Sequence, residues 1–185
     1  MRTVEQTLSL AAEDLTVVTA LMETRLLLGD SNRYEHIKSH STAEHMWDSQ
    51  KFYGRKWEEQ IIRHKKFADT EYSLEPNIKD GPGGLRDIQI LRWIALRHFK
   101  TADFRELQRF GIISVDEATS IIESERYLQA VRWTLHVLAG REEDRLLFDH
   151  QRTLASEAGF EDGDDALAVE PVSYTHLTLP TTSRV

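Results

Sequence analysis

The 185-residue sequence contains no cysteine. This absence excludes a disulfide framework, a zinc site with cysteine ligands and a thiol nucleophile. The sequence also has no apolar run approaching the roughly 18 residues of a membrane span, and its N-terminus lacks the apolar segment of a signal peptide. We therefore expect a cytoplasmic protein with no membrane partner.

An excess of basic residues is missing too. The 31 Asp and Glu residues outnumber the 23 Lys and Arg residues, for a net charge of −8. Because nucleic acid binding depends on a cationic surface, this balance argues against a nucleic acid partner. The hydrophobic content of 40% is nevertheless sufficient for a packed core.

What the sequence does contain is a succession of helix signals without convincing β alternation. Thr3 with Gln6, and Ser114 with Glu117, form capping boxes, and Asp14 is a further cap. We predict a short helix after Thr3, followed by helices over 15–28, 32–37, 46–66, 85–99, 104–110, 115–139 and 148–158. This order predicts an all-α fold, a helical bundle with one long loop containing Gly and Pro between its helices.

The apolar positions predict which helix faces are buried. In the long polar helix they are sparse, at Phe52, Trp57 and Ile61. The helix over 85–99 is strongly apolar. Its expected buried face consists of Leu85, Ile88, Leu91, Ile94 and Ala95.

The loop over 71–84 is the most informative segment. It contains two prolines and three glycines, which end any helix. Gly83 and Gly84 can adopt conformations closed to other residues and lie at the N-terminus of the next helix. Free N–H groups and the helix dipole favour an anion at such a position.

Two cations strengthen this prediction. Lys79 and Arg86 bring positive charge to the loop, and Arg86 can bind phosphate oxygens in bidentate fashion. The pattern suits a phosphate or a carboxylate, although no P-loop is present. A tight turn, with Arg86 and Asp87 tying the loop to neighbouring helices, is the structural alternative.

The remaining polar clusters predict little chemistry. The run 141–145 mixes acidic and basic residues and is typical of a solvated, salt-bridged corner, although an arginine such as Arg145 could face a nucleotide. His36, His40 and His45 are clustered but lack metal-site spacing. We therefore predict no metal site and no complete catalytic constellation.

The same loop carries a resemblance to a known family. Residues 74–79 (Leu-Glu-Pro-Asn-Ile-Lys) and 81–89 (Gly-Pro-Gly-Gly-Leu-Arg-Asp-Ile-Gln) strongly resemble the bacterial PII uridylyltransferase family, also called the uridylyl-removing enzyme of nitrogen control. The resemblance covers nearly all of residues 2–170. Further segments that look like the family, in the family's order, are 14–17, 23–30, 97–99, 111–113 and 144–149.

The resemblance implies an activity that needs more than this chain. Such an enzyme transfers UMP from UTP to a tyrosine of the PII protein, using Mg²⁺ held in a nucleotidyltransferase domain, and also removes the UMP. In that domain a G-G-x-G-R loop and a D-x-D pair hold UTP and the metal ions. The G-G-x-G-R loop is absent here. Asp162 and Asp164 have the spacing of the D-x-D pair, but they lack its strand context. The His-Asp phosphohydrolase and ACT domains do not fit either.

We therefore expect a piece cut at both ends. Residues 1–170 would be the helical domain that follows the nucleotidyltransferase domain, with no catalytic residue and no metal ligand of its own. Residues 171–185 hold two of the four prolines and one charged residue. They look like the translation of a reading frame that runs through the DNA of a sequencing-library adapter, and they are expected to be disordered.

The resemblance also suggests a use for the loop in the parent enzyme. Lys79, Gly83, Gly84 and Arg86 would face the nucleotide or PII. Asn77, Asp87 and Arg145 would support them, with Asp87 orienting Arg86. Two alternatives stay open: a helical module that binds a partner without chemistry, and the similar helical domain of glutamine synthetase adenylyltransferase.

Overall fold

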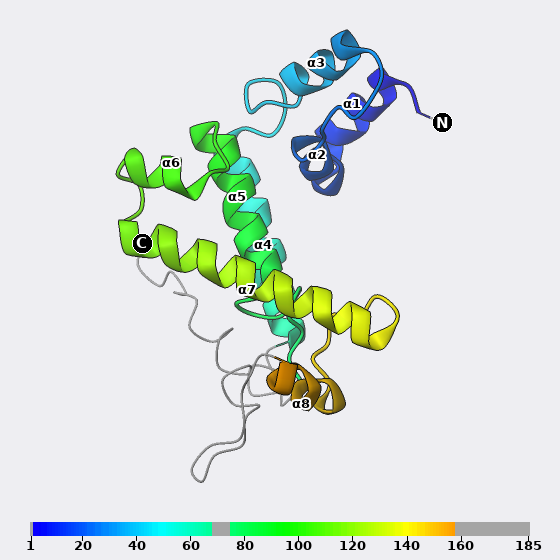
Figure 1. The fold of residues 1–185 in the computed structure, drawn as a ribbon. Helices are drawn as coiled ribbons and strands as arrows, with labels where there is room; N and C mark the ends of the chain where they lie inside the picture. The colour runs from blue at the N-terminus through cyan, green and yellow to red at the C-terminus, as the bar shows by residue number, and fades with distance from the viewer. Residues whose placement is uncertain (1, 68–74, 158–185) are drawn as a thin grey trace. The chain divides into compact units, whose positions relative to one another are not determined.

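The computed structural model describes residues 2–67 and 75–157, so the adapter-like tail over 171–185 lies outside the described residues. Within these two ranges every regular element is a helix, apart from an isolated bridge between Asn77 and Arg145 (Figure 1). The all-α prediction is therefore confirmed. The helices are α1 (Val4–Glu13), α2 (Leu15–Met22), α3 (Ser31–His40), α4 (Ser49–Phe67), α5 (Leu85–Phe99), α6 (Phe104–Arg109), α7 (Val115–Ala139) and α8 (Phe148–Glu157).

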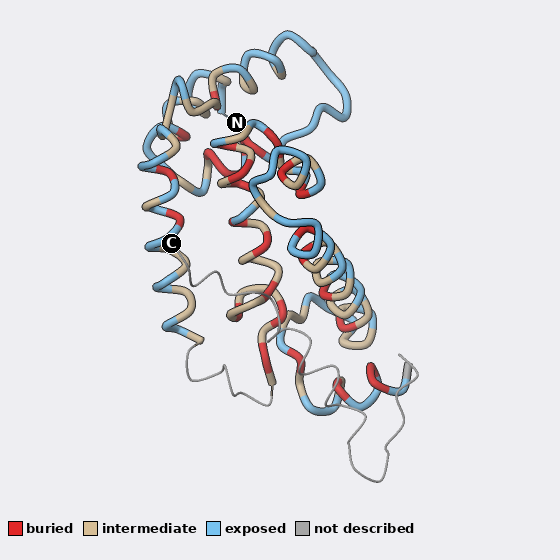
Figure 2. The backbone as a smooth tube through the Cα atoms, turned by 90° about the vertical axis from the view of Figure 1, so that its left-hand side faces the viewer, coloured by how far each residue is buried: buried red, intermediate tan, exposed pale blue. Residues whose placement is uncertain are grey.

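The chain forms two compact units. The first contains Met1–Glu59 and Arg92–Ala102, and the second contains Gln60–Leu91 and the residues after Ala102. Helices α4 and α5 each contribute one end to each unit. Buried residues occur in both units and are red in Figure 2.

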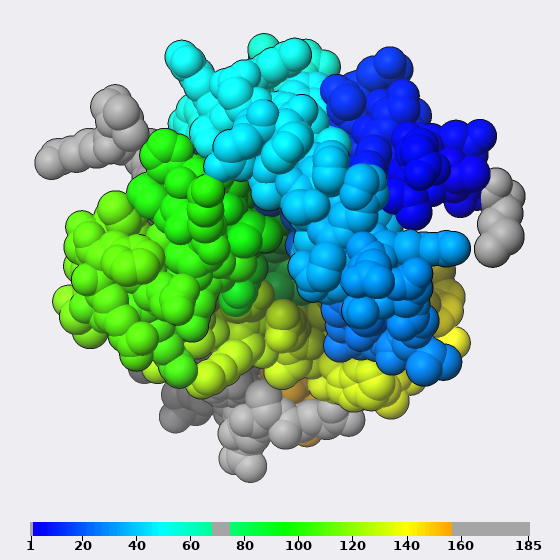
Figure 3. Space-filling model, turned by 90° about the horizontal axis from the view of Figure 1, so that it is seen from above, coloured from blue at the N-terminus to red at the C-terminus, as the bar shows by residue number. Residues whose placement is uncertain are grey.

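The first unit is organised around α1, which contacts both α2 and α3. The predicted capping box of Thr3 and Gln6 begins α1, and the carboxylate of Asp14 accepts from the N–H of Thr16 at 2.7 Å to begin α2. By contrast α3 has no buried residue, and it lies at the surface in light blue in Figure 3. The core of the unit is formed by apolar side chains of α1, α2, α4 and α5, among them Ala11, Val18, Leu21, Phe52, Trp93 and Ala95.

The second unit is organised around α7, which contacts α6 and α8. The capping box of Ser114 and Glu117 begins α7, and Gly140, in a left-handed conformation at φ 62°, follows its last residue. Both ends agree with the prediction, because capping is local chemistry. The buried side chains of this unit include Ile78, Ile88, Ile90, Phe104, Leu107, Leu128, Leu135, Leu146 and Leu154.

The second helix ends earlier than its apolar spacing predicted. It stops at Met22 instead of continuing to Gly29, because the N–H and hydroxyl of Thr24 both donate to the carbonyl of Leu21 and tighten the last turn. Beyond this point Leu27 is 80% exposed and Leu28 is 94% exposed. A leucine pattern thus indicates helix only where another element covers it.

Helices α3 and α4 also begin at other residues than predicted. Asp30, rather than Ser31, caps α3, which continues to His40. The carboxylate of Asp48 accepts from the N–H groups of Gln50 and Lys51 at 3.1 and 3.0 Å, so α4 begins at Ser49 rather than Met46. A carboxylate is as good a cap as a hydroxyl, and the nearest one decides the start.

The predicted buried stripe of α4 is only partly correct. Phe52 is fully buried, but Trp57 and Ile61 are 46% and 39% exposed. The buried neighbour is Lys56, whose ammonium lies 2.7 Å from Glu59 and 4.4 Å from the centroid of the Trp93 ring. A cation is tolerated in the interior because the carboxylate and the ring face replace its water.

Helix α5 has the predicted bounds but a different buried face. Ile88 and Ala95 are buried as expected, whereas Leu91 is 40% exposed. Ile90, Trp93 and Arg97 are buried in addition. Helical spacing shows that a face exists, but the neighbouring elements decide how far that face extends.

Candidate functional site

The loop that precedes α5 is a preorganised turn in the second unit. The side-chain oxygen of Asn77 accepts from the N–H groups of Lys79 and Asp80, at 3.1 and 2.7 Å, and its carbonyl accepts from the N–H of Gly81 at 3.0 Å. An asparagine in this position replaces the backbone partners that the loop lacks. Asn77 therefore shapes the loop.

Gly81 and Gly84 are required by the loop's own backbone. A Cβ atom on Gly84 would lie 2.9 Å from each of three carbonyl oxygens, those of Ile78, Lys79 and Gly81, and one on Gly81 would lie 2.5 Å from the carbonyl oxygen of Asn77. The close approach that the glycines permit is therefore an approach of the loop to itself.

Gly83 has the positive φ, 72°, that glycine adopts without strain. It lies two residues before the start of α5, and its N–H donates to the side chain of Asp87 in the first turn of that helix. The glycine pair therefore differs in function: Gly83 supplies a conformation, and Gly84 supplies space.

The N–H groups at the start of α5 are already occupied. Leu85 donates to the carbonyl of Ile78 at 3.1 Å and Arg86 donates to that of Lys79 at 2.8 Å. The N–H of Gly83 donates to the carboxylate of Asp87 at 2.8 Å. The prediction of free donors for an anion is wrong, because the chain supplies its own acceptors and its own negative charge at this helix end.

The carboxylate of Asp87 ties the loop to α4. It forms an ion pair with Arg63, lies 3.0 Å from the Nε2 atom of His64 and accepts from Gln60 at 3.2 Å. Arg63 also donates to the carbonyl of Asp80 at 2.7 Å. We expected Asp87 to orient Arg86, but it orients α4 instead.

The two partners of this central ion pair are well shielded from solvent. Only 11% of the Arg63 side chain and 15% of the Asp87 side chain are exposed. Sequence reasoning missed Arg63, although Gln60, Arg63 and His64 have the i, i+3, i+4 spacing of one helix face. That polar face was the available signal.

Arg86 turns toward the loop rather than toward Asp87. Its guanidinium lies 3.3 Å from the carboxylate of Asp80 and donates to the side chain of Gln89 at 2.5 Å. About a quarter of its side chain, 28%, is exposed.

Lys79 joins a second cluster, centred on the carboxylate of Asp144. The Lys79 ammonium lies 3.2 Å from Asp144, the Arg132 guanidinium lies 2.6 Å from it and the Nε2 atom of His136 lies 3.3 Å away. Burial raises the pKa of the Asp144 carboxyl. Hydrogen bonds from Arg132, Lys79 and His136 together outweigh this effect, so the pKa lies below its ordinary value. Asp144 is therefore held ionised.

The strand-like bridge fixes this corner to the loop. Ile78 donates to the carbonyl of Asp144 at 2.9 Å, and Leu146 donates to that of Pro76 at 2.8 Å. Arg145, 56% exposed at its side chain, lies 3.4 Å from Glu75. With the 2.6 Å pair of Arg141 and Glu143, the salt-bridged corner predicted over 141–145 is confirmed.

The structure brings together all of the predicted site residues, and they form a clamp that ties the loop to α4 and to the end of α7. Asn77, Lys79, Gly83, Gly84, Arg86 and Asp87 lie in one loop, and Arg145 lies beside it across the bridge. Each carboxylate of this region faces a cation, and within residues 2–67 and 75–157 no three His, Asp or Glu residues are grouped to hold a metal ion. The described side chains therefore do not fit a Mg²⁺ site.

These features define a helical domain whose loop is tied to its neighbouring helices by paired charges. Comparison with known proteins then identifies the family: the model of the GlnD PII-uridylyltransferase family matches residues 51–177. The chain belongs to this family, which agrees with the resemblance of its loop to the uridylyltransferases.

Curated relatives agree over a wider range. The chain is similar to the bifunctional uridylyltransferase/uridylyl-removing enzymes of Nitrosococcus oceani (45% identity over 170 residues), Pseudomonas aeruginosa (46% over 170) and Azotobacter vinelandii (48% over 160). These matches cover 92%, 92% and 86% of this chain, but only 19%, 19% and 18% of the relatives. The chain thus spans about a fifth of the length of these relatives. No solved structure matches it.

No helix within residues 2–67 and 75–157 is long and apolar enough to cross a bilayer.

Proposed function

We propose that this chain forms the helical part of a bifunctional uridylyltransferase/uridylyl-removing enzyme of the bacterial cytoplasm. The observation that carries the proposal is the identity of 45% over 170 residues with such an enzyme. The partners of the whole enzyme are then UTP and the PII protein. The chain contributes a scaffold, since the two aspartates at the centre of its loop region, Asp87 and Asp144, are paired with cations.

In the whole enzyme a tyrosine hydroxyl of PII attacks the α-phosphate of UTP, and pyrophosphate leaves. Mg²⁺, whose ligands would lie outside the described residues, would supply positive charge to the phosphates when bound. The helical part acts by positioning. Its loop holds α4, α5 and the end of α7 in fixed register through Asp87 and Asp144.

Within this function the loop keeps two cations that can approach a phosphate. The side chains of Lys79 and Arg86 are 29% and 28% exposed. We propose that these two residues bring positive charge to the nucleotide or PII, whereas Gly83, Gly84, Asn77, Asp87 and Arg145 shape and support the loop. Guanidinium and ammonium groups act on phosphate through charge-assisted hydrogen bonds.

A chimera tests the proposal. Residues 1–170 of this chain replace the matching segment of the full-length Pseudomonas aeruginosa relative, and transfer of labelled UMP to PII is measured. We expect kcat/KM for UTP within about tenfold of the natural enzyme. A folded chimera without transfer would contradict the assignment.

The loop is tested in the same chimera. Arg86→Ala is expected to lower kcat/KM for UTP by about tenfold or more, because a charge-assisted contact is lost. Arg109→Ala removes the same charge at an exposed position of α6 and serves as the matched control. An unchanged kcat/KM in Arg86→Ala would return the loop to a purely structural role.

A further inference from the structure

An exposed run of leucines lies in the first compact unit, outside the loop site. The segment that joins α2 to α3, residues 23–30, is exposed throughout, and we call it the leucine loop. Leu26 is 42% exposed, Leu27 80% and Leu28 94%. Single exposed apolar residues are common on protein surfaces, but three in succession are unfavourable unless they serve a function, and such patches mark interaction surfaces.

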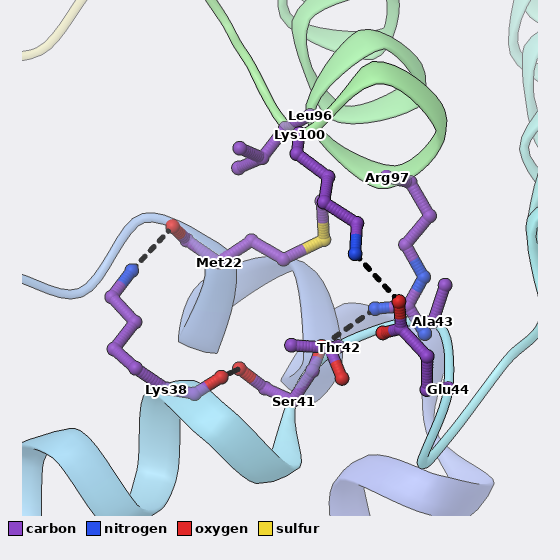
Figure 4. A pocket seen from close by; sticks show the side chains of 9 residues that line it. All are labelled: Met22, Lys38, Ser41, Thr42, Ala43, Glu44, Leu96, Arg97 and Lys100. Atoms are coloured by element: carbon purple, nitrogen blue, oxygen red, sulfur yellow. Dashed lines mark hydrogen bonds and ion pairs between the residues drawn. The ribbon is translucent and has the colours of Figure 1, made fainter.

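The start of the leucine loop is fixed to the helices beside it. The hydroxyl and the N–H of Thr24 donate to the carbonyl of Leu21, and the hydroxyl of Tyr34 donates to the carbonyl of Thr24 at 3.3 Å. Figure 4 shows the ammonium of Lys38, which donates at 3.0 Å to the carbonyl of Met22, the residue before the loop. Helix α3 therefore holds the end of α2 and the chain that leaves it.

The end of the leucine loop is set by local geometry. Gly29 has a φ of 125°, a conformation that residues with a Cβ atom rarely adopt. The next residue, Asp30, caps α3, because its carboxylate accepts from the N–H of Asn32 at 2.9 Å. The leucines thus lie between two fixed points. A partner that covers them has little chain to order, and such preorganisation favours binding.

The size of the patch favours a partner that is tethered to this chain. Three leucine side chains offer an apolar area on the order of 300 Å². A stable interface between separate proteins buries about 800 Å² on each partner, so a second copy of this chain would need more contact area than the leucines provide. A segment of the same polypeptide needs less, because the covalent link gives it a high effective concentration.

The relatives contain additional chain that could supply this partner. The match to the Nitrosococcus oceani enzyme covers 92% of this chain but 19% of the relative, so about four-fifths of that enzyme lies outside the matched part. A match over 170 of the 185 residues includes the leucine loop wherever the match begins. The loop therefore belongs to the part that this chain shares with a much longer polypeptide.

We propose that the leucine loop is the contact through which this helical part docks onto another part of the same polypeptide in the parent enzyme. The three leucines pack against an apolar surface of that part, and the fixed ends of the loop hold them in position. This inference rests on the proposed function, since the occupant belongs to the parent enzyme.

Hydrogen–deuterium exchange tests the proposal. Peptides that cover residues 23–30 are compared between the isolated 185-residue chain and the full-length chimera that carries residues 1–170 in the Pseudomonas aeruginosa relative. We expect exchange in the chimera to be slower by about tenfold or more, because an occupant that covers the loop restricts its opening to water. Equal exchange rates in the two proteins would overturn the proposal.

The double variant Leu27→Gln/Leu28→Gln tests the leucines themselves. In the isolated chain it should leave the midpoint of urea unfolding unchanged, since both side chains are already exposed. In the chimera it should abolish the slow exchange of the leucine loop, and slow exchange that survives it would contradict the proposal. Leu28→Gln alone replaces it if the double variant of the chimera fails to fold.

The matched control is Ile62→Gln. Ile62 is 70% exposed on α4 and stands alone between charged residues, with Glu58 one turn before it and Lys66 one turn after it. The control removes the same kind of apolar side chain, and the chimera that carries it should keep the slow exchange of the leucine loop. Loss of slow exchange in this control would show that the effect is not specific to the leucines.

Two other occupants are separated by further measurements. Sedimentation of the isolated chain at increasing concentration detects a second copy, and addition of PII to the chimera detects a protein partner. Self-association that the double variant abolishes, or slow exchange that requires PII, would overturn the proposal. Transfer of UMP tests the proposed function separately, because an active chimera with rapid exchange in the leucine loop would refute only this contact.

Discussion

At the scale of single residues, two aspartates hold the candidate site together. Asp87 receives Arg63, His64 and an N–H group at the start of α5. Asp144 receives two cations and a histidine. Both aspartates are bound by several partners, so they hold the shape of the loop.

The Asp87 cluster predicts a large loss of stability when its carboxylate is removed. Asp87→Ala leaves the 11%-exposed guanidinium of Arg63 without its counter-charge. We expect the free energy of unfolding, measured with urea, to fall by about 2–4 kcal/mol. Glu123→Ala, at an exposed position of α7, should change it by less than about 0.5 kcal/mol. Equal effects of the two substitutions would contradict the clamp.

The Asp144 cluster predicts a pH dependence with a definite sign. The pKa of Asp144 is lower in the folded chain than the ordinary value of about 3.9 expected in the unfolded chain. The folded state therefore binds fewer protons, and stability from this carboxylate is present above about pH 4 and lost as pH falls through the folded pKa.

Asp144→Asn isolates this contribution. We expect the natural chain to be more stable than Asp144→Asn near neutral pH, with a difference of about 1–3 kcal/mol in the free energy of unfolding. The difference should shrink as pH is lowered below about 4. Urea unfolding at a series of pH values measures it, and a difference that grows toward acid would show that the sign is wrong.

At the scale of elements, local chemistry determines where the helices begin and end, whereas packing of the backbone against itself determines the shape of the loop. The bounds of α5 and α7 were predictable because apolar spacing and caps act within a few residues. The internal hydrogen bonds at the start of α5 were not, because the carbonyls of Ile78 and Lys79 meet that helix only after the loop has folded back.

Two glycines, one in the loop and one in α4, should respond to alanine with opposite signs. In Gly84→Ala the new Cβ meets three backbone carbonyl oxygens at 2.9 Å, and we expect the chain to lose about 1–3 kcal/mol of stability. Gly54→Ala places a methyl group in open space within α4, and it should gain about 0.5–1 kcal/mol. Thermal and urea unfolding of both variants measure this contrast, and a gain in Gly84→Ala would refute the packing argument.

At the scale of the whole molecule, the chain corresponds to only part of its relatives. It spans about a fifth of their length, and the two central aspartates of its loop region are paired with cations. We expect the isolated chain, mixed with PII, UTP and Mg²⁺, to transfer no labelled UMP above background. Natural full-length enzyme is the positive control. Robust transfer by the isolated chain would show that it holds catalytic groups of its own.

The sequence by itself determined the helical class, most helix ends and the family, because caps, periodicity and a run of matching residues are readable without contacts. Only the tertiary structure decided which groups meet. It placed Arg63 and His64 beside Asp87 and Lys79 beside Asp144. It also paired the N–H groups at the start of α5, which the sequence had predicted to be free for an anion, with carbonyls of the loop. The reason is that partners of a buried charge come from segments distant in sequence, where neither spacing nor propensity specifies the pairing.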